Sequence, residues 1–354
     1  PTFIYVSCDG DDTNDGSEEH PLATLAGARD ALRKVASTSL SPIKVLFRGG
    51  EYRVDSAVSF TEADSGTKAA PITFAAYPGE TPVFIGGVHV AAEDVVPCTE
   101  ESILSRVTDP EAKAQLMQID LSSYLEVIPD IYSFGHTEND ANKPVAIYCG
   151  ETPLTRSRWP NADEDMPYLR TADEVRASGD SKVISYGQDA LARAKTWSEE
   201  SLDDLYIFGF LAYDWTNETY DASGISRGAK TITLKGGLNS YFNSITGNKR
   251  FYFFNLPEEI DKPGESYIDR ENRIVYFYPP EGFDASKVVV STTVDTLLSF
   301  DGCSHVVIEG LTFGYTRGNA LTVSNADDFT LRNCTIAHTS HNGGSFSGTN
   351  ITLT

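Results

Sequence analysis

Apolar residues recur at a fixed spacing in the last third of the chain. Residues 306–313 (VVIEGLTF) align with residues 329–336 (FTLRNCTI), so that apolar positions and an internal threonine agree at an offset of 23 residues. A third copy begins at Ser345 and is incomplete at Thr354. A period in the low twenties with β-favouring residues is typical of the coils of a parallel β-solenoid. We therefore expect an all-β protein in which equivalent side chains stack about 4.8 Å apart on successive coils, and a solenoid that continues past Thr354.

The beginning of the chain has the same short-strand pattern, preceded by one amphipathic helix. Thr24 is placed to cap a helix that carries Leu25, Ala28 and Leu32 on one face. Such a helix can cover the open end of a solenoid. We assign residues 1–89 to an N-terminal cap and the first coils. Glycine-containing turns separate the short strands that we expect there, at 44–47, 52–54, 58–60, 72–77 and 83–85.

The regular spacing is lost in the middle of the chain. Helix-favouring stretches occur at 111–117 and 188–197, among irregularly spaced strands. An inserted domain between the first coils and the main stack is the simplest explanation of this change. We therefore predict an inserted β-rich domain over residues 90–227 and further β-helix coils over residues 228–354.

Charge and hydropathy exclude several classes of partner. The 354 residues carry a formal net charge of −23, and no strongly basic patch is visible. Nucleic acid and anionic membrane surfaces both need such a patch, so we expect neither as a partner. The chain has no run of 18 apolar residues, and we expect no membrane insertion.

We expect neither a metal nor a cofactor. The five cysteines are scattered and lack the CxxC spacing of a zinc site. The acidic loop at 9–17 fails the test for a calcium-binding EF-hand. Counted from Asp11, the position that should be a bidentate glutamate is Leu22. Turn and cap chemistry accounts for the aspartate, asparagine and glycine residues of this loop equally well.

Short motifs follow one another in a distinctive order along the chain. They are 5–7 (YVS) with 12–17 (DTNDGS) and 21–25 (PLATL), 48–52 (RGGEY), 64–67 (DSGT), 76–80 (AYPGE), 158–161 (RWPN), 261–270 (DKPGESYIDR) and 276–280 (YFYPP). Together they resemble right-handed parallel β-helix carbohydrate-active enzymes, closest to glycoside hydrolase family 141 and its relatives in families 120 and 136. The resemblance covers most of the chain and is weakest between residues 90 and 143.

This resemblance implies a right-handed parallel β-helix with an inserted β-sandwich-like domain and a catalytic pair of carboxylic acids on the solenoid face. The implied activity is hydrolysis of glycosidic bonds in plant or host oligosaccharides and polysaccharides. A chain that starts at a strand without a methionine is compatible with a processed precursor. We therefore expect an extracellular or cell-surface location.

The visible coils offer no obvious catalytic pair. Two-carboxylate hydrolysis needs acids about 5–5.5 Å apart for retention and about 6.5–9.5 Å apart for inversion. We therefore looked for acids one period apart. Asp301 falls opposite Ser324, Glu309 opposite Arg332 and Asp328 opposite Ile351, and no acid follows Asp328. The catalytic residues stay unassigned, and we expect them on coils beyond this segment.

Two groups of residues are candidates for sugar contact. One lies in the turns after the repeats: Tyr315, Arg317, His338 and His341. Two histidines three apart also suggest a metal, but the sequence places no third ligand. In the alternative interpretation both are solvated surface residues.

The second group is Arg158, Trp159 and Asn161, where an aromatic face beside a guanidinium and an amide suits a sugar. In the alternative interpretation Trp159 belongs to the core of the insert and Asn161 caps a turn.

Two other functions remain open for this sequence. A polysaccharide lyase on the same fold would need a base and a cation, usually Ca²⁺ or a basic groove, to neutralise a uronate, and the coils show neither. A non-catalytic carbohydrate-binding or adhesion solenoid would explain the missing acid pair directly.

Overall fold

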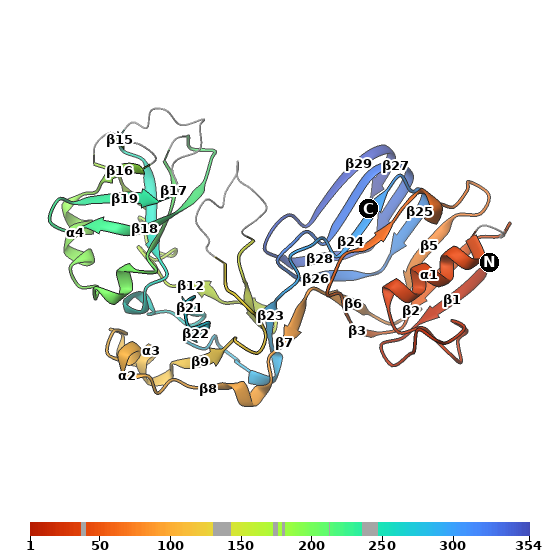
Figure 1. The fold of residues 1–354 in the computed structure, drawn as a ribbon, viewed down its shortest axis with the longest axis horizontal. Coiled ribbons are helices and arrows are strands. Elements are labelled where there is room, and N and C mark those ends of the chain that lie inside the picture. The colour runs from red at the N-terminus through yellow and green to blue at the C-terminus, as the bar shows by residue number, and fades with distance from the viewer. Residues whose placement is uncertain (37–39, 130–142, 173–175, 179–180, 212, 236–246) are drawn as a thin grey trace. The chain divides into compact units, whose positions relative to one another are not determined.

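The computed structural model describes residues 1–36, 40–129, 143–172, 176–178, 181–211, 213–235 and 247–354 (Figure 1). The described chain is mostly β. It divides into two compact units: the first is formed by Pro1–Val88 and Val289–Thr354, and the second by His89–Val288. In the described part of the chain, no helix is long and apolar enough to cross a membrane.

The first unit is built from parallel strands contributed by both ends of the chain. One 8-stranded sheet has the order β1-β2-β5-β25-β27-β24-β4, with β29 on β27, and a 4-stranded sheet has the order β28-β26-β6-β3. Figure 1 shows the red and orange strands from the N-terminal end beside the blue strands from the C-terminal end. The strands are β1 (Thr2–Val6), β2 (Ile43–Phe47), β3 (Gly50–Arg53), β4 (Val58–Phe60), β5 (Ile72–Ala76), β6 (Pro82–Ile85), β24 (Leu298–Asp301), β25 (Ser304–Glu309), β26 (Thr312–Thr316), β27 (Leu321–Arg332), β28 (Thr335–Thr339) and β29 (Gly344–Leu353).

The 23-residue repeat is the register of strand pairing. Leu298 pairs with Leu321, Val306 with Phe329, and Thr312 with Thr335, which are all 23 residues apart. The predicted stacking of successive copies is therefore confirmed. The short strands expected near the N-terminus also form, each within two residues of its predicted bounds.

The last pair of strands departs from this register. An irregularity between Val323 and Ala326 shifts the pairing of β27 with β29, so that Ile351 lies opposite Phe329. The prediction that Asp328 faces Ile351 is therefore wrong by one residue. The register shift coincides with Gly348, whose φ is +148°. A Cβ atom at this position would lie 2.1 Å from the Ala326 carbonyl oxygen, so only glycine fits here.

Aromatic rings stack between coils in the core of the first unit. The rings of Phe60 and Phe300 lie 4.6 Å apart and nearly parallel, and the ring of Phe329 lies 5.2 Å from that of Phe300. All three side chains are almost completely buried. Because Phe60 comes from the first coils and the other two come from the last third of the chain, this core cannot form until both chain segments meet.

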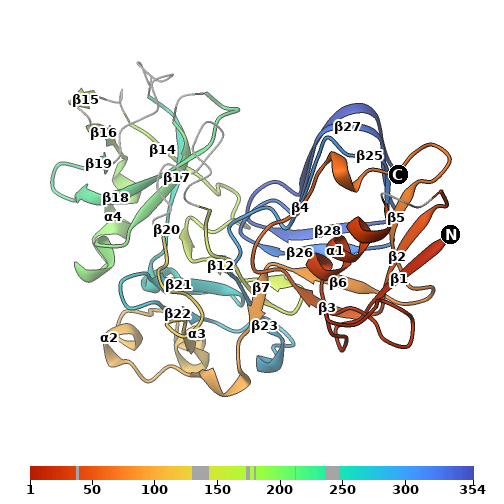
Figure 2. The same ribbon diagram turned by 45° about the vertical axis from the view of Figure 1, so that its right-hand side comes forward.

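A helix covers part of this core, as predicted. Helix α1 (Leu25–Ala36) contributes Leu25, Ala28 and Leu32 to the core (Figure 2). The Thr24 hydroxyl accepts a hydrogen bond from the Gly27 amide at 2.9 Å, which confirms its role as the cap. In the acidic loop, the Asp12 carboxylate accepts hydrogen bonds from the Ala23 and Thr24 amides, at 2.9 and 3.0 Å. Asp12 thus orders the entry to the helix.

The second unit contains two larger sheets. A 5-stranded sheet has the order β12-β21-β22-β9-β8, and an 8-stranded sheet has the order β13-β20-β17-β18-β19-β16-β15, with β14 on β20. Its strands are β8 (Val95–Pro97), β9 (Met117–Asp120), β10 (Ile147–Cys149), β11 (Thr152–Pro153), β12 (Thr155–Arg156), β13 (Arg158–Trp159), β14 (Leu169–Arg170), β15 (Arg176–Ser178), β16 (Ser181–Ser185), β17 (Tyr206–Phe210), β18 (Glu218–Ser226), β19 (Thr231–Lys235), β20 (Arg250–Phe254), β21 (Glu265–Asp269) and β22 (Ile274–Phe277). β7 (Gly87–His89) and β23 (Val288–Ser291) contain the two boundaries between the units.

Short helices complete the second unit. They are α2 (Glu101–Leu104), α3 (Pro110–Gln115) and α4 (Gln188–Ala194), with single turns η2 (Ala92–Asp94), η4 (Glu200–Leu202), η5 (Pro257–Glu259) and η6 (Ala285–Lys287); η1 (Glu62–Asp64) lies in the first unit. α3 and α4 occupy the two predicted helix-favouring stretches.

The second unit extends further along the chain than the predicted insert. We expected it to end at residue 227, whereas the compact unit runs to Val288. The reason lies in the pairing: β19 and β20 are antiparallel partners of β16, β17 and β18, and the hairpin of β21 and β22 pairs with β9. Alternating apolar residues look alike in an antiparallel sheet and in a solenoid coil, so the sequence pattern did not separate them.

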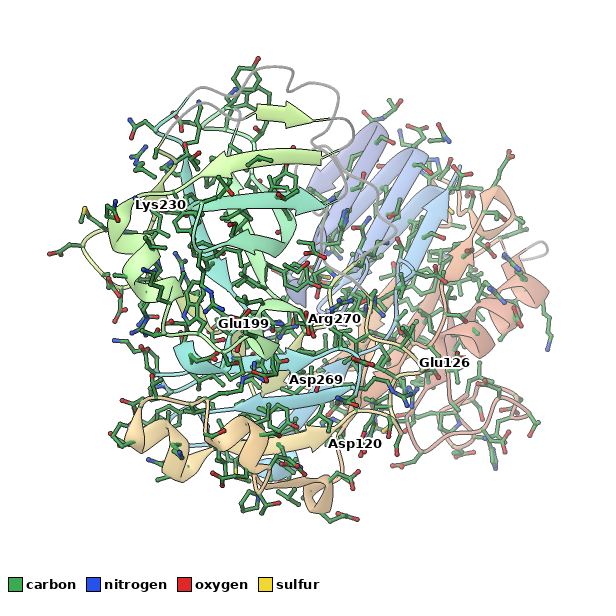
Figure 3. All side chains as sticks on the ribbon, turned by 60° about the vertical axis from the view of Figure 1, so that its left-hand side comes forward. Asp120, Glu126, Glu199, Lys230, Asp269 and Arg270 are labelled. Carbon is green, nitrogen blue, oxygen red and sulfur yellow. The ribbon has the colours of Figure 1, made fainter. Side chains whose placement is uncertain are left out.

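Buried acids are paired with cations in the second unit. The Glu259 carboxylate, 1% exposed, accepts two hydrogen bonds from the Arg193 guanidinium at 2.7 and 2.6 Å and another from the Trp197 indole. Asp204 pairs with Arg270 at 2.9 Å, and Figure 3 labels Arg270 beside Asp269, the last residue of β21. These pairs join loops to the sheets.

Replacing Phe300 by alanine should test the shared core of the first unit. Loss of a buried ring stacked between two coils should reduce the free energy of unfolding by about 3–5 kcal/mol. Chemical denaturation monitored by circular dichroism measures this change. Phe3→Ala is the matched control, because the Phe3 ring is 44% exposed. Equal effects of the two substitutions would contradict the assigned core.

Arg193→Met should leave Glu259 buried without its cation. The expected loss is about 3–5 kcal/mol of unfolding free energy, because a single buried charge keeps its desolvation cost after its partner is removed. Arg53→Met is the control, since Arg53 and its partner Asp55 are both exposed. The same denaturation experiment applies, and a loss no larger than that of the control would count against the buried pair.

Candidate functional site

Tyr315 and His338 occupy equivalent positions on successive coils of the first unit. Their ring centroids lie 4.7 Å apart, and both residues adopt left-handed backbone conformations, with φ of 52° and 56°. The His341 Nδ1 atom lies 2.7 Å from the Asn319 side-chain oxygen. These three residues are partly exposed, so their side chains can be reached from solvent.

Arg317 has a different environment from the one expected. Its side chain is 7% exposed, and burial lowers the pKa of its guanidinium. We predicted it on the same polar rim as Tyr315, but the turn directs it inward. A sugar contact by Arg317 would require the turn to open.

Two acids of these coils, Glu309 and Asp301, are held by non-acidic partners. Glu309 lies in register with Arg332 and forms a 2.9 Å ion pair with it. Asp301 accepts hydrogen bonds from Ser324 at 2.7 Å and Asn325 at 2.8 Å, which lower the pKa of its carboxyl group. The expected oppositions of Asp301 to Ser324 and of Glu309 to Arg332 are confirmed. No two acids face each other across the strand pairs described for the coils.

A cavity of about 750 Å³ lies within the second unit. Its walls come from β12, β13, β17, β18, β20 and the turn that leads into β21. Two of the predicted sugar-contact residues, Arg158 and Asn161, line it. The lining residues are Pro144, Val145, Ala146, Leu154, Thr155, Arg156, Arg158, Asn161, Ala162, Asp163, Phe208, Thr219, Tyr252, Phe254, Lys262, Pro263 and Glu265.

Strand alternation separates Trp159 from its two predicted companions. Successive side chains of a strand point to opposite faces, so Arg158 lines the cavity and Trp159 packs on the hydrophobic core. The Trp159 ring meets that of Trp197 edge-on at 6.4 Å. Trp159 thus takes the place described by the alternative interpretation, in the core of the second unit.

Two guanidinium groups share the cavity wall. Arg156 and Arg158 are two residues apart and both line it. The Arg158 guanidinium lies 3.5 Å above the Tyr252 ring and donates hydrogen bonds to the carbonyl oxygens of Pro160 and Pro167. Arg156 donates one long hydrogen bond, of 3.4 Å, to the Val145 carbonyl oxygen. Burial lowers the pKa of Arg158, and that of Arg156 to about 10.

Glu265 is the acidic group of the cavity that the sequence did not single out. Its carboxylate is 6% exposed and accepts hydrogen bonds from the amides of Asp261 and Lys262, at 2.9 and 3.0 Å. Burial raises its pKa to about 7, helped by the negative charges of Asp261 and Glu259. Glu265 lies inside the motif 261–270, but no feature of the sequence indicates that this glutamate is buried.

The remaining polar groups of the cavity are partly satisfied by each other. Lys262 pairs with Asp163 at 3.1 Å. Asn161 donates from its amide nitrogen to Asp261 at 2.8 Å, while its amide oxygen is buried without a hydrogen-bond partner among the described residues. With the ring faces of Tyr252, Phe208 and Phe254, the cavity offers apolar walls and a few convergent polar groups. This is the usual composition of a small-molecule site.

Comparison with known proteins supports a shared fold. A solved structure described as a glycoside hydrolase superposes with a TM-score of 0.62 over 94% of this chain, at 15% sequence identity. The chain has the fold of that hydrolase. It spans 65% of the length of that structure. A complex of XylC with xylose also matches, over 99% of this chain and 52% of that one at 12% identity. Its TM-score of 0.39 is too low to show a shared fold.

Comparison of sequences does not assign the chain to a family. No protein-family model matches the chain. The uncharacterized protein YwoF of Bacillus subtilis (strain 168) is 34% identical over 107 residues, which are 30% of this chain and 19% of YwoF. The chain therefore corresponds to less than a fifth of this relative.

Glu265→Gln should remove a pH dependence of stability. Because the folded protein holds the Glu265 proton up to about pH 7 and the unfolded chain releases it near pH 4.5, wild-type unfolding free energy falls as pH rises between these values. The glutamine variant lacks this loss. It should match wild type at pH 5 and exceed it by about 3 kcal/mol at pH 8.

Denaturant titrations of both proteins at the two pH values measure this difference. Glu281→Gln is a matched control at an exposed glutamate and should show no such gain. If wild type and Glu265→Gln keep the same difference in stability at both pH values, Glu265 is ionised in the folded protein and the assignment is wrong.

Proposed function

We propose that this chain is part of an exported glycoside hydrolase, and that its first unit belongs to a right-handed parallel β-helix. The supporting observation is the parallel register of 23 residues between coils. The superposition on a structure described as a glycoside hydrolase, with a TM-score of 0.62, adds to it. The order of the sequence motifs favours family 141 with its relatives in families 120 and 136.

In this proposal the substrate is an oligosaccharide or polysaccharide of plant or host origin, met outside the cell or at its surface. Two carboxyl groups cleave the glycosidic bond, one as acid and the other as base or nucleophile. Because the acids on the described coils face serine, arginine and other non-acidic partners, we place the catalytic pair on coils outside these residues. Tyr315, His338 and His341 would then contact the sugar near the catalytic coils.

A non-catalytic carbohydrate-binding solenoid is the second candidate function. The observation in its favour is the same set of neutralised acids, together with the exposed ring pair of Tyr315 and His338. A stacked aromatic pair provides a flat face for a pyranose ring without any catalytic group. The two candidates differ in one outcome, which is cleavage of the bound sugar.

The natural full-length protein should release product from at least one member of a panel of aryl glycosides and plant or host oligosaccharides. Chromatography and a reducing-end assay measure release. Replacing single Asp and Glu residues of the natural protein by Asn and Gln should identify two positions at which activity falls at least 1000-fold. Sugar binding without product release from any substrate would instead establish the binding protein.

Tyr315→Ala and His338→Ala should each raise KM about 5-fold with little change in kcat, because a lost ring face removes about 1 kcal/mol of binding. Tyr213→Ala is the control, an exposed aromatic residue in the second unit. Unchanged KM in both coil variants would remove these residues from the substrate site.

A further inference from the structure

The cavity of the second unit has an unbalanced charge. Arg156 and Arg158 line it, and their hydrogen bonds go to carbonyl oxygens rather than to carboxylates, while Glu265 and Glu164 act on Arg158, and Asp204 on Arg156, only through their charge. Buried and half-buried charges are normally paired, because desolvation without a partner is costly. Arg158 has ring and carbonyl contacts, but these do not neutralise its charge.

The other charged groups of the cavity do not correct this imbalance. Asp163 is engaged by Lys262 at 3.1 Å. Glu265 carries at most part of a negative charge near neutral pH, since its hydrogen-bonded position is buried. Three cations, Arg156, Arg158 and Lys262, thus line the cavity with two acids, Asp163 and Glu265, in a protein whose formal net charge is −23. An anionic ligand is the natural counterpart of this excess.

The geometry favours a planar anion attached to a ring. The Tyr252 ring face and the carbonyl oxygens of Pro160 and Pro167 fix the plane of the Arg158 guanidinium. These hydrogen bonds do not use Nη1, which can donate to a ligand. A guanidinium fork matches a carboxylate in shape and can donate two parallel hydrogen bonds to it. Phe208 and Phe254 provide apolar surface nearby, and the Asn161 amide oxygen lacks a donor. The volume of about 750 Å³ lies in the range of small-molecule sites.

We propose that this cavity binds a sugar unit that carries a carboxylate, with the carboxylate against Arg156 and Arg158 and the sugar ring against the apolar wall of Phe208 and Phe254. The sugar part rests on the proposed carbohydrate function, while the carboxylate part rests on the cavity alone. The lining residues all belong to the second unit, and none of them is a member of the catalytic pair that we propose, so we assign the cavity to holding an acidic glycan rather than to cleaving it.

Titration calorimetry on the full chain tests the proposal with D-glucuronate and D-galacturonate as probes. D-glucose and D-galactose are the neutral counterparts, and acetate and inorganic phosphate are anions without the sugar ring. At least one uronate should bind at least 10-fold more tightly than its neutral counterpart and than both simple anions. Equal binding of uronate and neutral sugar, or no binding at all, overturns the proposal. Phosphate or acetate binding as tightly as the uronate overturns the assignment of a sugar.

Two substitutions locate the binding. Arg156→Met and Arg158→Met should each weaken uronate binding at least 10-fold, whereas Arg170→Met, at an exposed arginine of the same unit, should not. Arg158→Met also removes the contact of the guanidinium with the Tyr252 ring, so Arg158→Lys and thermal unfolding of every variant accompany it. Arg158→Lys should retain charge and fold but still lose affinity. Unchanged affinity in folded Arg156→Met and Arg158→Met would overturn the site.

The pH dependence provides a further readout. Glu265 is surrounded by Asp261, Glu259, Lys262 and Arg158, and its ionisation places a second anion beside the bound carboxylate. Uronate affinity should fall severalfold between pH 6 and pH 8, and Glu265→Gln should abolish this fall. A wild-type affinity that rises or stays constant over this range contradicts the placement of the ligand.

Failure of this proposal and failure of the proposed function are distinguishable. Cleavage of a glycan by the natural protein without uronate binding to the second unit would overturn the acidic-sugar site and leave the hydrolase. Uronate binding without cleavage of any glycan would support the site and overturn the hydrolase.

Discussion

The first unit depends on one constraint, which is that each coil must return to the same register. Parallel strands 23 residues apart place Leu298 beside Leu321 and Val306 beside Phe329, and every core position repeats with them. The same constraint binds the two ends of the chain: Val58 pairs with Leu298, and Ile72 pairs with Val306. The chain leaves the stack after its first coils and returns after the second unit without losing the alignment.

Such a long insertion is compatible with the parallel sheets of the first unit for a physical reason. The entropy of closing a loop grows only slowly with its length, and a folded insert contributes its own core. Burial of a continuous apolar interior offsets the entropy that is lost when β4 pairs with β24 and β5 pairs with β25. In this interior Phe60 stacks on Phe300 at 4.6 Å. The insert is therefore free to carry a different architecture and a cavity of its own.

Acidic side chains differ in burial and in their partners between the two units. On the coils the acids are exposed and face a neutral or positive side chain one repeat away, such as Arg332 opposite Glu309. In the second unit, some acids are buried and paired with an arginine, as Glu259 is with Arg193. At the cavity, Glu265 instead accepts hydrogen bonds from backbone amides, and the hydrogen bonds of Arg156 and Arg158 go to carbonyl oxygens. That contrast is what sets the cavity apart from the rest of the structure.

The sequence by itself determined the features that depend on local pattern: the 23-residue register, the Thr24 cap of α1, and the opposition of Glu309 to Arg332. A fixed period and local hydrogen bonds depend on residues that are close to one another in the sequence. Only the tertiary structure decided the register shift at Gly348, the extension of the second unit to Val288, the inward position of Arg317 and the burial of Glu265 beside Arg158. Each of these depends on which distant strand or loop covers a residue, and adjacent residues such as Arg158 and Trp159 carry no mark of which face will meet a cavity and which a core.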